Sequence, residues 1–196
     1  MLTVKDLYDL SHSLAGDYLA QFTYPWEALA GISDLILEIG KQLPQEEYYH
    51  PADWDGKVLE DVWVAKDATV FKTAYLHGPC IIGHRTEVRQ CAFIRGSALV
   101  GNDCVVGNST ELKNVILFDN VQVPHYNYVG DSILGYKAHM GAGSITSNVK
   151  SDKLPVVVKD GISQIETGRK KVEHIQIIQL FAGALELDGL AGGFQP

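Results

Sequence analysis

The chain has 196 residues, of which 46% are apolar and 20% are charged, and its formal net charge is −8. This length fits one domain with appendages, and the composition is ordinary for a globular protein with a buried core. The acidic balance excludes general nucleic-acid binding, which needs a basic surface. The sequence has neither an apolar run of about 18 residues nor a secretory leader, so we expect no membrane association and a cytoplasmic location.

Residues 1–50 are predicted to form a helical cap. Thr3 with Asp6 three places later resembles a capping box, and Pro25 suits the first turn of a helix. The helix that follows has one apolar face, which comprises Leu29, Ile32, Leu35, Ile36, Ile39 and Leu43. Because a stack of strands leaves unpaired edges at its ends, we expect these helices to cover the open end of the next domain.

Residues 51–150 are predicted to form a β-solenoid, because every sixth residue over a long stretch is apolar. The series is Val64, Val70, Leu76, Ile82, Val88, Ile94, Val100, Val106, Leu112 and Phe118. The place two residues before each next aliphatic is small in eight hexads: Ala68, Ala74, Cys80, Thr86, Ala92, Ala98, Cys104 and Thr110. Since side chains alternate between the faces of a strand, both series point inward, and the chain turns a corner after each short strand.

Three such hexads make one coil of about 18 residues, so roughly four to five coils are expected. Five glycines directly follow an aliphatic of the series: Gly83, Gly101, Gly107, Gly135 and Gly141. At these corners we expect backbone conformations that glycine adopts easily. Cys80, Cys91 and Cys104 are predicted to be small core or corner residues rather than metal or redox groups.

The hexad register breaks once. After Phe118 the sixth position is Pro124, and the apolar series resumes at Tyr128, Leu134 and Met140. We therefore expect the stretch around residues 122–128 to bulge out as a loop, which is where a rigid scaffold tends to carry function.

Residues 151–196 lose the hexad period and are predicted to form a loop and a helical tail. The first part is polar and basic, and Ile175, Ile178, Ala182 and Leu185 then follow at helical spacing. The predicted tail stands in place of further coils.

Functional side chains gather near the break in the register. Arg95 and Lys113 are one coil apart, so we expect them to stack on one face about 5 Å apart. Two stacked cations on an acidic protein are a candidate phosphate clamp. Glu111, His125 and Tyr128 lie close to them in the sequence.

The stretch from Arg95 to Asn148 resembles a known family of acetyltransferase domains. Its motifs ELK, PH-x-x-Y-x-GD and GAG-x-I-x-x-N are specific in combination. They resemble the acetyltransferase domain of the bifunctional N-acetylglucosamine-1-phosphate uridyltransferase / glucosamine-1-phosphate acetyltransferase. The resemblance implies a left-handed parallel β-helix, an exception to the usual right-handed crossover. It also implies homotrimers with sites between neighbouring prisms and acetyl-CoA as the acyl donor.

The resemblance also implies a role for individual residues. His125 is the general base that takes a proton from the sugar amine, and Glu111 orients its imidazole. Arg95, Lys113 and Tyr128 hold the sugar phosphate. The amide of Ala142 faces the acyl carbonyl, where a backbone N–H stabilises the oxyanion, and Asn148 binds where sugar and cofactor meet. No metal is expected.

This chain departs from the family pattern at three places. His139 stands where the family has an asparagine that contacts the sugar, and Leu154 stands where it has a lysine, with Lys153 beside it. The nucleotidyltransferase domain is missing. The coils that build the coenzyme A groove are also missing after Lys171, so impaired cofactor binding is expected.

Three functions remain open at this stage. The first is an N-acyltransferase acting on an amino-sugar phosphate or a nucleotide sugar. The second is a non-catalytic trimeric sugar-phosphate binding module that partners a nucleotidyltransferase. The third, a zinc hydratase of the γ-carbonic-anhydrase type, is disfavoured because His77, His84, His125 and His139 lack the required spacing.

Overall fold

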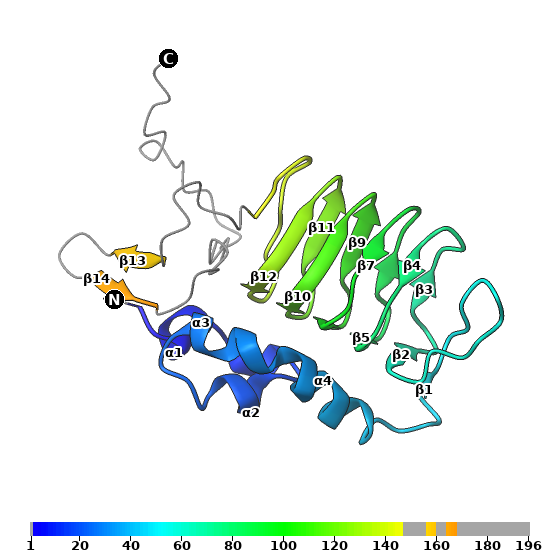
Figure 1. Cartoon of the computed structure of the whole chain (residues 1–196), viewed down its shortest axis with the longest axis horizontal. Coiled ribbons are helices and arrows are strands. Elements are labelled where there is room, and N and C mark those ends of the chain that lie inside the picture. The colour runs from blue at the N-terminus through cyan, green and yellow to red at the C-terminus, as the bar shows by residue number, and fades with distance from the viewer. Residues whose placement is uncertain (1, 147–155, 160–163, 168–196) are drawn as a thin grey trace, which may run out of the picture.

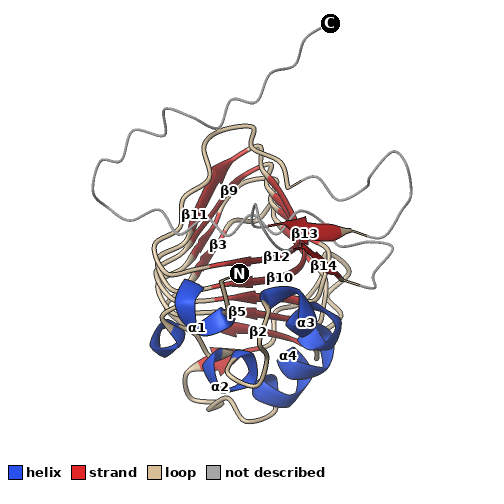
Figure 2. Ribbon diagram, turned by 90° about the vertical axis from the view of Figure 1, so that its left-hand side faces the viewer, coloured by secondary structure: helices blue, strands red, loops and turns tan. Residues whose placement is uncertain are grey.

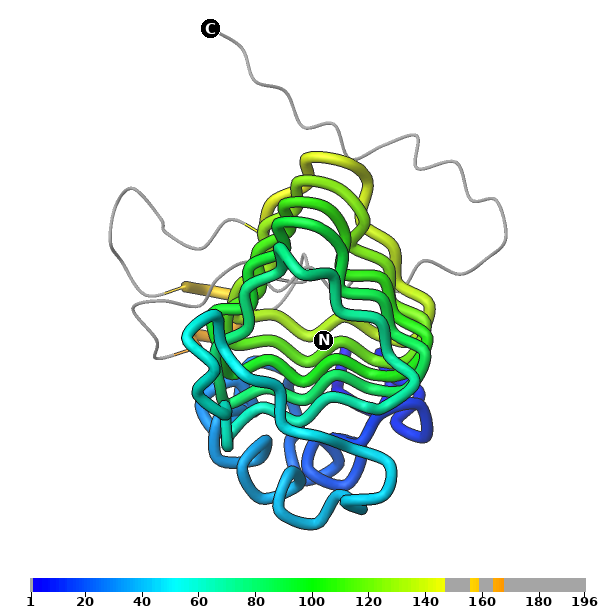
Figure 3. The backbone as a smooth tube through the Cα atoms, turned by 90° about the vertical axis from the view of Figure 1, so that its right-hand side faces the viewer, coloured from blue at the N-terminus to red at the C-terminus, as the bar shows by residue number. Residues whose placement is uncertain are grey.

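The computed structural model of the chain describes residues 2–146, 156–159 and 164–167. Short parallel strands stack into a three-sided prism of coils, as Figure 1 shows from the side and Figure 3 from one end. The β-solenoid predicted from the hexads is confirmed. It matches the left-handed parallel β-helix that the resemblance implies, with an N-terminal helical region.

The N-terminal region consists of short helices. Their bounds are α1 (Val4–Leu7), η1 (Leu10–His12), α2 (Gly16–Leu19), α3 (Pro25–Ala28), η2 (Leu29–Gly31) and α4 (Ile32–Gly40). The Asp6 carboxylate accepts hydrogen bonds from the N–H and the hydroxyl of Thr3, at 2.8 and 2.7 Å. Pro25 is the first residue of α3, where its missing N–H costs nothing. Both start signals in the sequence are confirmed.

The strands form the three sides of the prism. Their bounds are β1 (Tyr48–Tyr49), β2 (Val62–Ala65), β3 (Thr69–Val70), β4 (Tyr75–Leu76), β5 (Cys80–Ile82), β6 (Glu87–Val88), β7 (Phe93–Ile94), β8 (Ala98–Val100), β9 (Val105–Asn108), β10 (Glu111–Leu117), β11 (Gln122–His125) and β12 (Tyr128–Leu134). The first side holds β2, β5, β8 and the ends of β10 and β12. The second side holds β3, β6, β9 and β11, and the third holds β4, β7 and the beginnings of β10 and β12.

The first coils follow the predicted hexad register. Ile82 pairs with Val64 on one side and with Val100 on the other, each 18 residues away. The small inward places are also filled as predicted, and Thr86 and Cys104 are fully buried. Large and small side chains alternate inside the prism, which allows the narrow interior to be closely packed.

The predicted break in the register is wrong in size and in place. Val100 pairs with Leu117 rather than with Phe118, and Leu117 pairs with Leu134, so each coil here is one residue shorter. Val123 and Val129 therefore take the inward places that the sequence pattern gave to Pro124 and Tyr128. Residues 122–125 are the strand β11, not a loop. The shortening occurs inside β10 and β12, which turn a prism corner.

The helices cover the first side of the prism rather than its open end, which corrects our expectation. α4 contacts β5, β8 and β10, and Figure 2 shows the helical layer lying along the sheet. The outward side chains of this side form a buried apolar column that the hexads do not reveal: Trp63, Ile81, Leu99, Ile116 and Ile133. The buried face of α4, with Ile32, Leu35 and Ile36, packs in the same core.

The open end at the first coil is covered by a strand. β1 pairs antiparallel with β2, with Tyr48 opposite Ala65 and Tyr49 opposite Val64. The residues between them form a turn in which Ala52 bridges Val58. This strand pairs with the backbone groups at the edge of β2. From the sequence we expected the helices to cover this end.

Gly83, Gly101 and Gly107 allow close approach between coils rather than unusual dihedral angles. None of the five predicted corner glycines has a positive φ, whereas ten non-glycine corner residues do, among them Arg85 and Tyr126. A Cβ on Gly83 would lie 2.5 Å from the Gly101 carbonyl oxygen, and one on Gly107 would overlap Pro124. The next coil thus passes too close for any side chain there.

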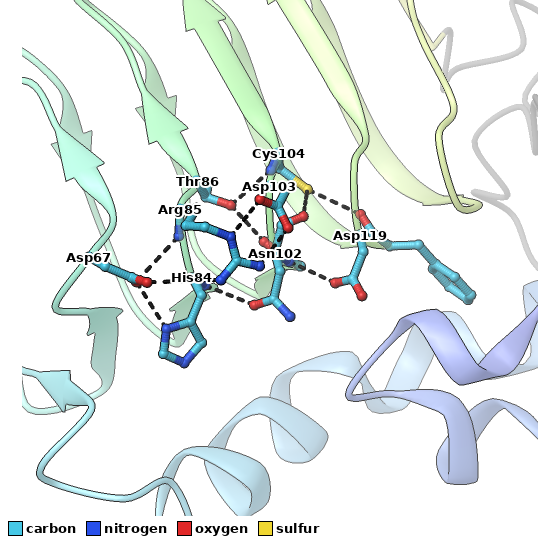
Figure 4. Close-up of polar contacts among 10 residues, drawn as sticks. Asp67, His84, Arg85, Thr86, Asn102, Asp103, Cys104 and Asp119 are labelled. Atoms are coloured by element: carbon cyan, nitrogen blue, oxygen red, sulfur yellow. Dashed lines mark hydrogen bonds and ion pairs between the residues drawn. The ribbon is translucent and has the colours of Figure 1, made fainter.

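One corner is held by a ladder of polar side chains, which Figure 4 shows between the first and second sides. The Asn102 side-chain oxygen accepts a hydrogen bond from the His84 N–H at 2.8 Å, and Asp119 accepts one from the Asn102 N–H at 2.7 Å. Arg85 forms a bidentate ion pair with Asp103, in which each hydrogen bond is 2.7 Å long. This hydrogen-bonded partner lowers the pKa of the Asp103 carboxyl. Each coil therefore caps backbone groups of the coil below.

After the prism, β13 (Val157–Lys159) and β14 (Gln164–Glu166) form an antiparallel hairpin within the stretch that the sequence gave as a loop. The predicted C-terminal helix and Asn148 lie outside the described residues. Among the residues described, no helix is long and apolar enough to cross a membrane.

Candidate functional site

His125 lies at the corner between the second and third sides of the prism. It is the last residue of β11, pairs with Asn108 of the coil below, and is exposed. Its ring makes no hydrogen bond or ion pair with any part of the chain that the structure describes. The Gly143 N–H donates to the His125 carbonyl at 3.0 Å, so the Gly141–Ser144 turn of the next coil lies beside it. The imidazole is therefore open to a ligand.

Asn127 fixes the backbone around this histidine. It is 2% exposed, and its side-chain oxygen accepts a hydrogen bond from the His125 N–H at 3.1 Å. Its amide donates to the carbonyls of Gly141 and Ser144, at 2.7 and 3.2 Å. Its backbone carbonyl accepts from the Glu111 N–H at 2.8 Å. The side chain and backbone of one buried residue thus connect His125, the glycine turn and the strand of Glu111.

The sequence analysis missed Asn127, although a signal exists. With the corrected register, Asn127 occupies the small inward place two residues before Val129, where Thr110 stands one coil below. An asparagine at an inward place must find hydrogen-bond partners, because burying an unpaired amide is costly. Such a residue beside an exposed histidine points to a rigid site.

Glu111 lies across the same corner, at the start of β10. Its carboxylate forms an ion pair with the Arg95 guanidinium at 2.6 Å. The resemblance implies that this carboxylate contacts the His125 imidazole and orients it. In this structure the guanidinium holds it instead.

Arg95 and Lys113 lie on adjacent strands of the third side, as their spacing predicts. Arg95 donates its backbone N–H to Leu112 at 2.9 Å, which places Lys113 directly beyond it. The Lys113 ammonium contacts Asp131 at 2.7 Å. Each cation of the predicted phosphate clamp therefore has a carboxylate partner, and a phosphate group would have to compete with these carboxylates.

Asp131 also connects the clamp to the helical layer. The Asn114 amide donates both to Asp131 and to the Leu29 carbonyl of η2, the latter at 3.1 Å. Lys113, Asp131 and Asn114 thus form a polar chain that ends on the N-terminal helices.

The remaining predicted residues are distributed around the corner. Tyr128 pairs in register with Glu111 and is half-buried on the third side. Ala142 is exposed in the glycine turn, and its N–H has no hydrogen-bond partner in the described part of the chain. His139 is bridged to Gln122 on the second side, so β11 separates it from the third-side cations. The prism therefore brings together every predicted residue that it describes except His139.

The other candidate groups in the described residues do not form a catalytic centre. Cys80 and Cys104 are buried, as predicted, and burial raises the pKa of both thiols, that of Cys104 to about 12. Cys91 is an exposed corner residue. Residues 2–146, 156–159 and 164–167 contain no group of three His, Cys, Asp or Glu residues that could hold a metal ion.

Comparison with known proteins finds similarity over part of the chain. Residues 76–162 match the family model described as the GMPPB C-terminal domain. The chain is 35% identical over 136 residues to the bifunctional protein GlmU of Methanococcus aeolicus, covering 60% of this chain and 33% of that protein. It is 39% identical over 79 residues to GlmU of Methanococcus maripaludis, covering 40% of this chain and 19% of that protein.

The resemblance seen in the sequence is confirmed. The chain spans a fifth to a third of the length of these curated relatives, so their activities come to it only as proposals. GlmU of a Nostoc species is 36% identical over 93 residues, covering 47% of this chain and 20% of that protein.

Solved structures with partial similarity come from two acetyltransferases. The acetyltransferase domain of PglB from Neisseria gonorrhoeae has a TM-score of 0.29 and 17% identity, covering 43% of this chain and 48% of that one. A GDP-perosamine N-acetyl transferase mutant from Caulobacter crescentus, in complex with CoA and GDP-perosamine, has a TM-score of 0.24 and 16% identity, covering 59% and 60%. At these TM-scores the two structures carry no argument about this chain.

Proposed function

We propose that the chain is an acyltransferase that moves the acetyl group of acetyl-CoA to the amine of an amino-sugar phosphate or nucleotide sugar. The observation that carries the proposal is the corner at His125. There the His125 imidazole is exposed, and buried Asn127 fixes the backbone beneath it and the adjacent glycine turn. The two cations Arg95 and Lys113 lie on the neighbouring side of the prism. Preorganised groups of this kind accelerate acyl transfer.

The proposed reaction joins the amine nitrogen to the acetyl carbon and breaks the carbon–sulfur bond. His125 accepts the proton that the attacking amine loses and passes it to the leaving thiolate. The Ala142 N–H stabilises the oxyanion that forms on the acetyl oxygen. Tyr128, which pairs in register with Glu111, helps to hold the phosphate of the sugar.

Phosphate binding would complete the site by replacing the carboxylate partners of Arg95 and Lys113. Arg95 and Lys113 hold the phosphate, and a phosphate that binds Arg95 draws the guanidinium away from Glu111. The released carboxylate can then orient the His125 imidazole across the corner. The free protein thus keeps the carboxylate occupied until the substrate arrives.

A homotrimer would complete the site from a neighbouring prism. The third side carries exposed aromatic and aliphatic side chains: Tyr75, Phe93 and Ile145. A flat sheet side with such residues is suited to pack on a copy of itself. His125 and Tyr126 at its edge would then face the adjoining subunit.

The test is an acetylation assay that follows thiol release from acetyl-CoA with glucosamine 1-phosphate and with amino-sugar nucleotides. We expect His125→Ala to lower kcat about 10²- to 10⁴-fold, the size of general-base catalysis. Gln122→Ala, on the exposed part of the same strand, is the matched control and should keep full activity. Equal loss in both variants would contradict the role of His125.

A second candidate is a non-catalytic trimeric sugar-phosphate binding module that partners a nucleotidyltransferase. It is favoured by the His125 ring, which has no orienting contact among the described residues. Calorimetry separates the two candidates. An acyltransferase binds both acetyl-CoA and sugar phosphate, whereas the module binds sugar phosphate alone.

A further inference from the structure

A pocket of about 350 Å³ lies at the opposite end of the prism from the last coil. It is formed between the turn that follows β1 and the corner from β3 to β4, at the end where β1 and β2 are drawn in Figure 1. Its volume is at the lower end of the range for small-molecule sites. The interior side chains of the first coil, Val70 and Leu76, form part of its lining.

Four aromatic side chains line this pocket: Tyr49, Trp54, Phe71 and Tyr75. Trp54 is 87% exposed, although an indole usually buries most of its surface. Tyr75 is supported from the next coil by Phe93, whose ring meets it edge to face at 5.6 Å. The pocket thus offers flat apolar faces for a ring.

The turn that carries Trp54 is already rigid. One carboxylate oxygen of Asp53 accepts hydrogen bonds from the N–H groups of Asp55 and Lys57, at 3.0 and 2.8 Å. The Asp53 N–H donates to the Lys57 carbonyl at 2.9 Å, and Gly56 supplies the positive φ that the turn requires. A preorganised turn loses little conformational entropy when a ligand binds.

Lys72 gives the pocket one partner for an anionic group. Lys72 is the single cation among the described residues that line it, and the carboxylate of Asp53 is engaged by the turn. The lining contains no Ser, Thr, Asn or Gln side chain. Aromatic rings dominate the lining, and a nucleobase can stack on them.

We propose that this pocket binds a nucleoside phosphate, with the base stacked on Trp54 and Phe71 and the phosphate at Lys72. This site is separate from the acyltransferase corner and does not depend on the function proposed there. Lys72 and His125 occupy the same corner column, three strands apart, which corresponds to about 14 Å. The nucleotide can therefore be free or the end of a nucleotide sugar that extends toward His125.

Titration with UMP, GMP, CMP and AMP tests the proposal through tryptophan fluorescence and calorimetry. Trp26 and Trp63 are buried, so quenching by a bound base reports on Trp54. We expect Trp54→Ala to weaken binding about tenfold or more and Trp54→Phe to retain most of it. Lys72→Ala should weaken binding of the nucleotide but not of the matching nucleoside. Lys66→Ala, exposed in the same coil, is the control.

The first three results described here overturn the site, and the fourth supports it. No binding of any of the four nucleotides at millimolar concentration, or an affinity that Trp54→Ala leaves unchanged, removes it. Binding of glucosamine 1-phosphate in the pocket without nucleotide binding would make it a sugar site instead. Loss of mononucleotide binding in His125→Ala would place the nucleotide at the acyltransferase corner. A nucleotide sugar that loses affinity in both Trp54→Ala and His125→Ala identifies the spanning ligand.

Discussion

At the scale of single residues, the corner of His125 depends on one buried amide. Asn127 makes hydrogen bonds to His125, Gly141 and Ser144, and no apolar side chain can replace them. Removing it takes the acceptor from the His125 N–H and one of two donors from each of the Gly141 and Ser144 carbonyls. The position therefore couples the stability of the coil to the geometry of the site.

We expect Asn127→Ala to lower the free energy of unfolding by about 1–3 kcal/mol, the cost of unsatisfied buried groups. Urea denaturation measures this change. Asn108→Ala, which removes a half-buried side chain with one hydrogen bond on the coil below, is the control and should cost less. A smaller loss for Asn127 than for Asn108 would contradict the role of the buried amide.

The buried thiols predict how stability depends on pH. The pKa of the Cys104 thiol rises to about 12 in the folded protein because burial disfavours the thiolate. The unfolded chain ionises this thiol near its ordinary value, so unfolding is favoured as pH rises above about 9. The full contribution is present below that pH and is lost toward pH 12.

We therefore expect thermal stability to fall more steeply between pH 9 and 10.5 for the native sequence than for Cys104→Ala. Each such thiol adds up to about 1.4 kcal/mol per pH unit in this range. Differential scanning calorimetry across the range measures the slope. Cys91→Ala, which removes an exposed thiol, should leave the slope unchanged.

At the scale of elements, the helical layer and the β-helix share a border of outward apolar side chains. Leu99 points to the helices and its neighbour Val100 points into the prism, and both are buried. The two positions thus separate packing between layers from packing between coils. The alternation follows directly from the pleat of a strand.

We expect Leu99→Glu to detach the helices while the coils remain folded, because the buried charge disrupts only the contact between layers. Limited proteolysis should then cut within residues 1–45 before it cuts the β-helix. Val100→Glu should instead unfold the coils. Equal cleavage patterns for the two variants would contradict the assignment of their faces.

The sequence predicts the coils well and their later register poorly, for a physical reason. The hexads report on inward side chains, and Val64 to Leu112 follow them. Phe118 continues the apolar series although the inward place belongs to Leu117, because Phe118 is buried against Tyr8 of the helical layer. An apolar residue at the right spacing therefore concealed the one-residue shortening.

The helical layer and the site illustrate a second limit of prediction from the sequence. Periodicity identified the apolar face of α4, but not the side of the prism that it covers, since that requires the outward column at Ile81 and Leu99. Motifs located His125 and the cations. The partners of Arg95 and Lys113 could not be predicted, because their carboxylates come from other coils.

At the scale of the whole molecule, the three sides of the prism have different surroundings. Helices cover the first side, and the third side leaves Tyr75 and Phe93 40–50% exposed. A copy of the chain packed on this third side would bury these rings. These exposed rings support the proposed trimer.

We expect light scattering to give the mass of a trimer for the native chain and a smaller mass for Phe93→Glu. The charge would be buried without a partner in the interface. Gln122→Glu on the second side is the control and should remain trimeric. A monomer for the native chain at micromolar concentration would remove the trimer and the intersubunit site.

The strand β1 has a consequence for growth by stacking. A β-helix ends in strands that could accept another parallel strand, and a second prism could join there to start a filament. β1 runs antiparallel to β2 and is only two residues long. It therefore pairs with the edge of β2. A strand of a second molecule would have to pair with β1 instead, which is too short and runs in the opposite direction to the coils. The strand thus blocks the addition of another prism along the first side, and the two other edges at this end, β3 and β4, are only two residues long.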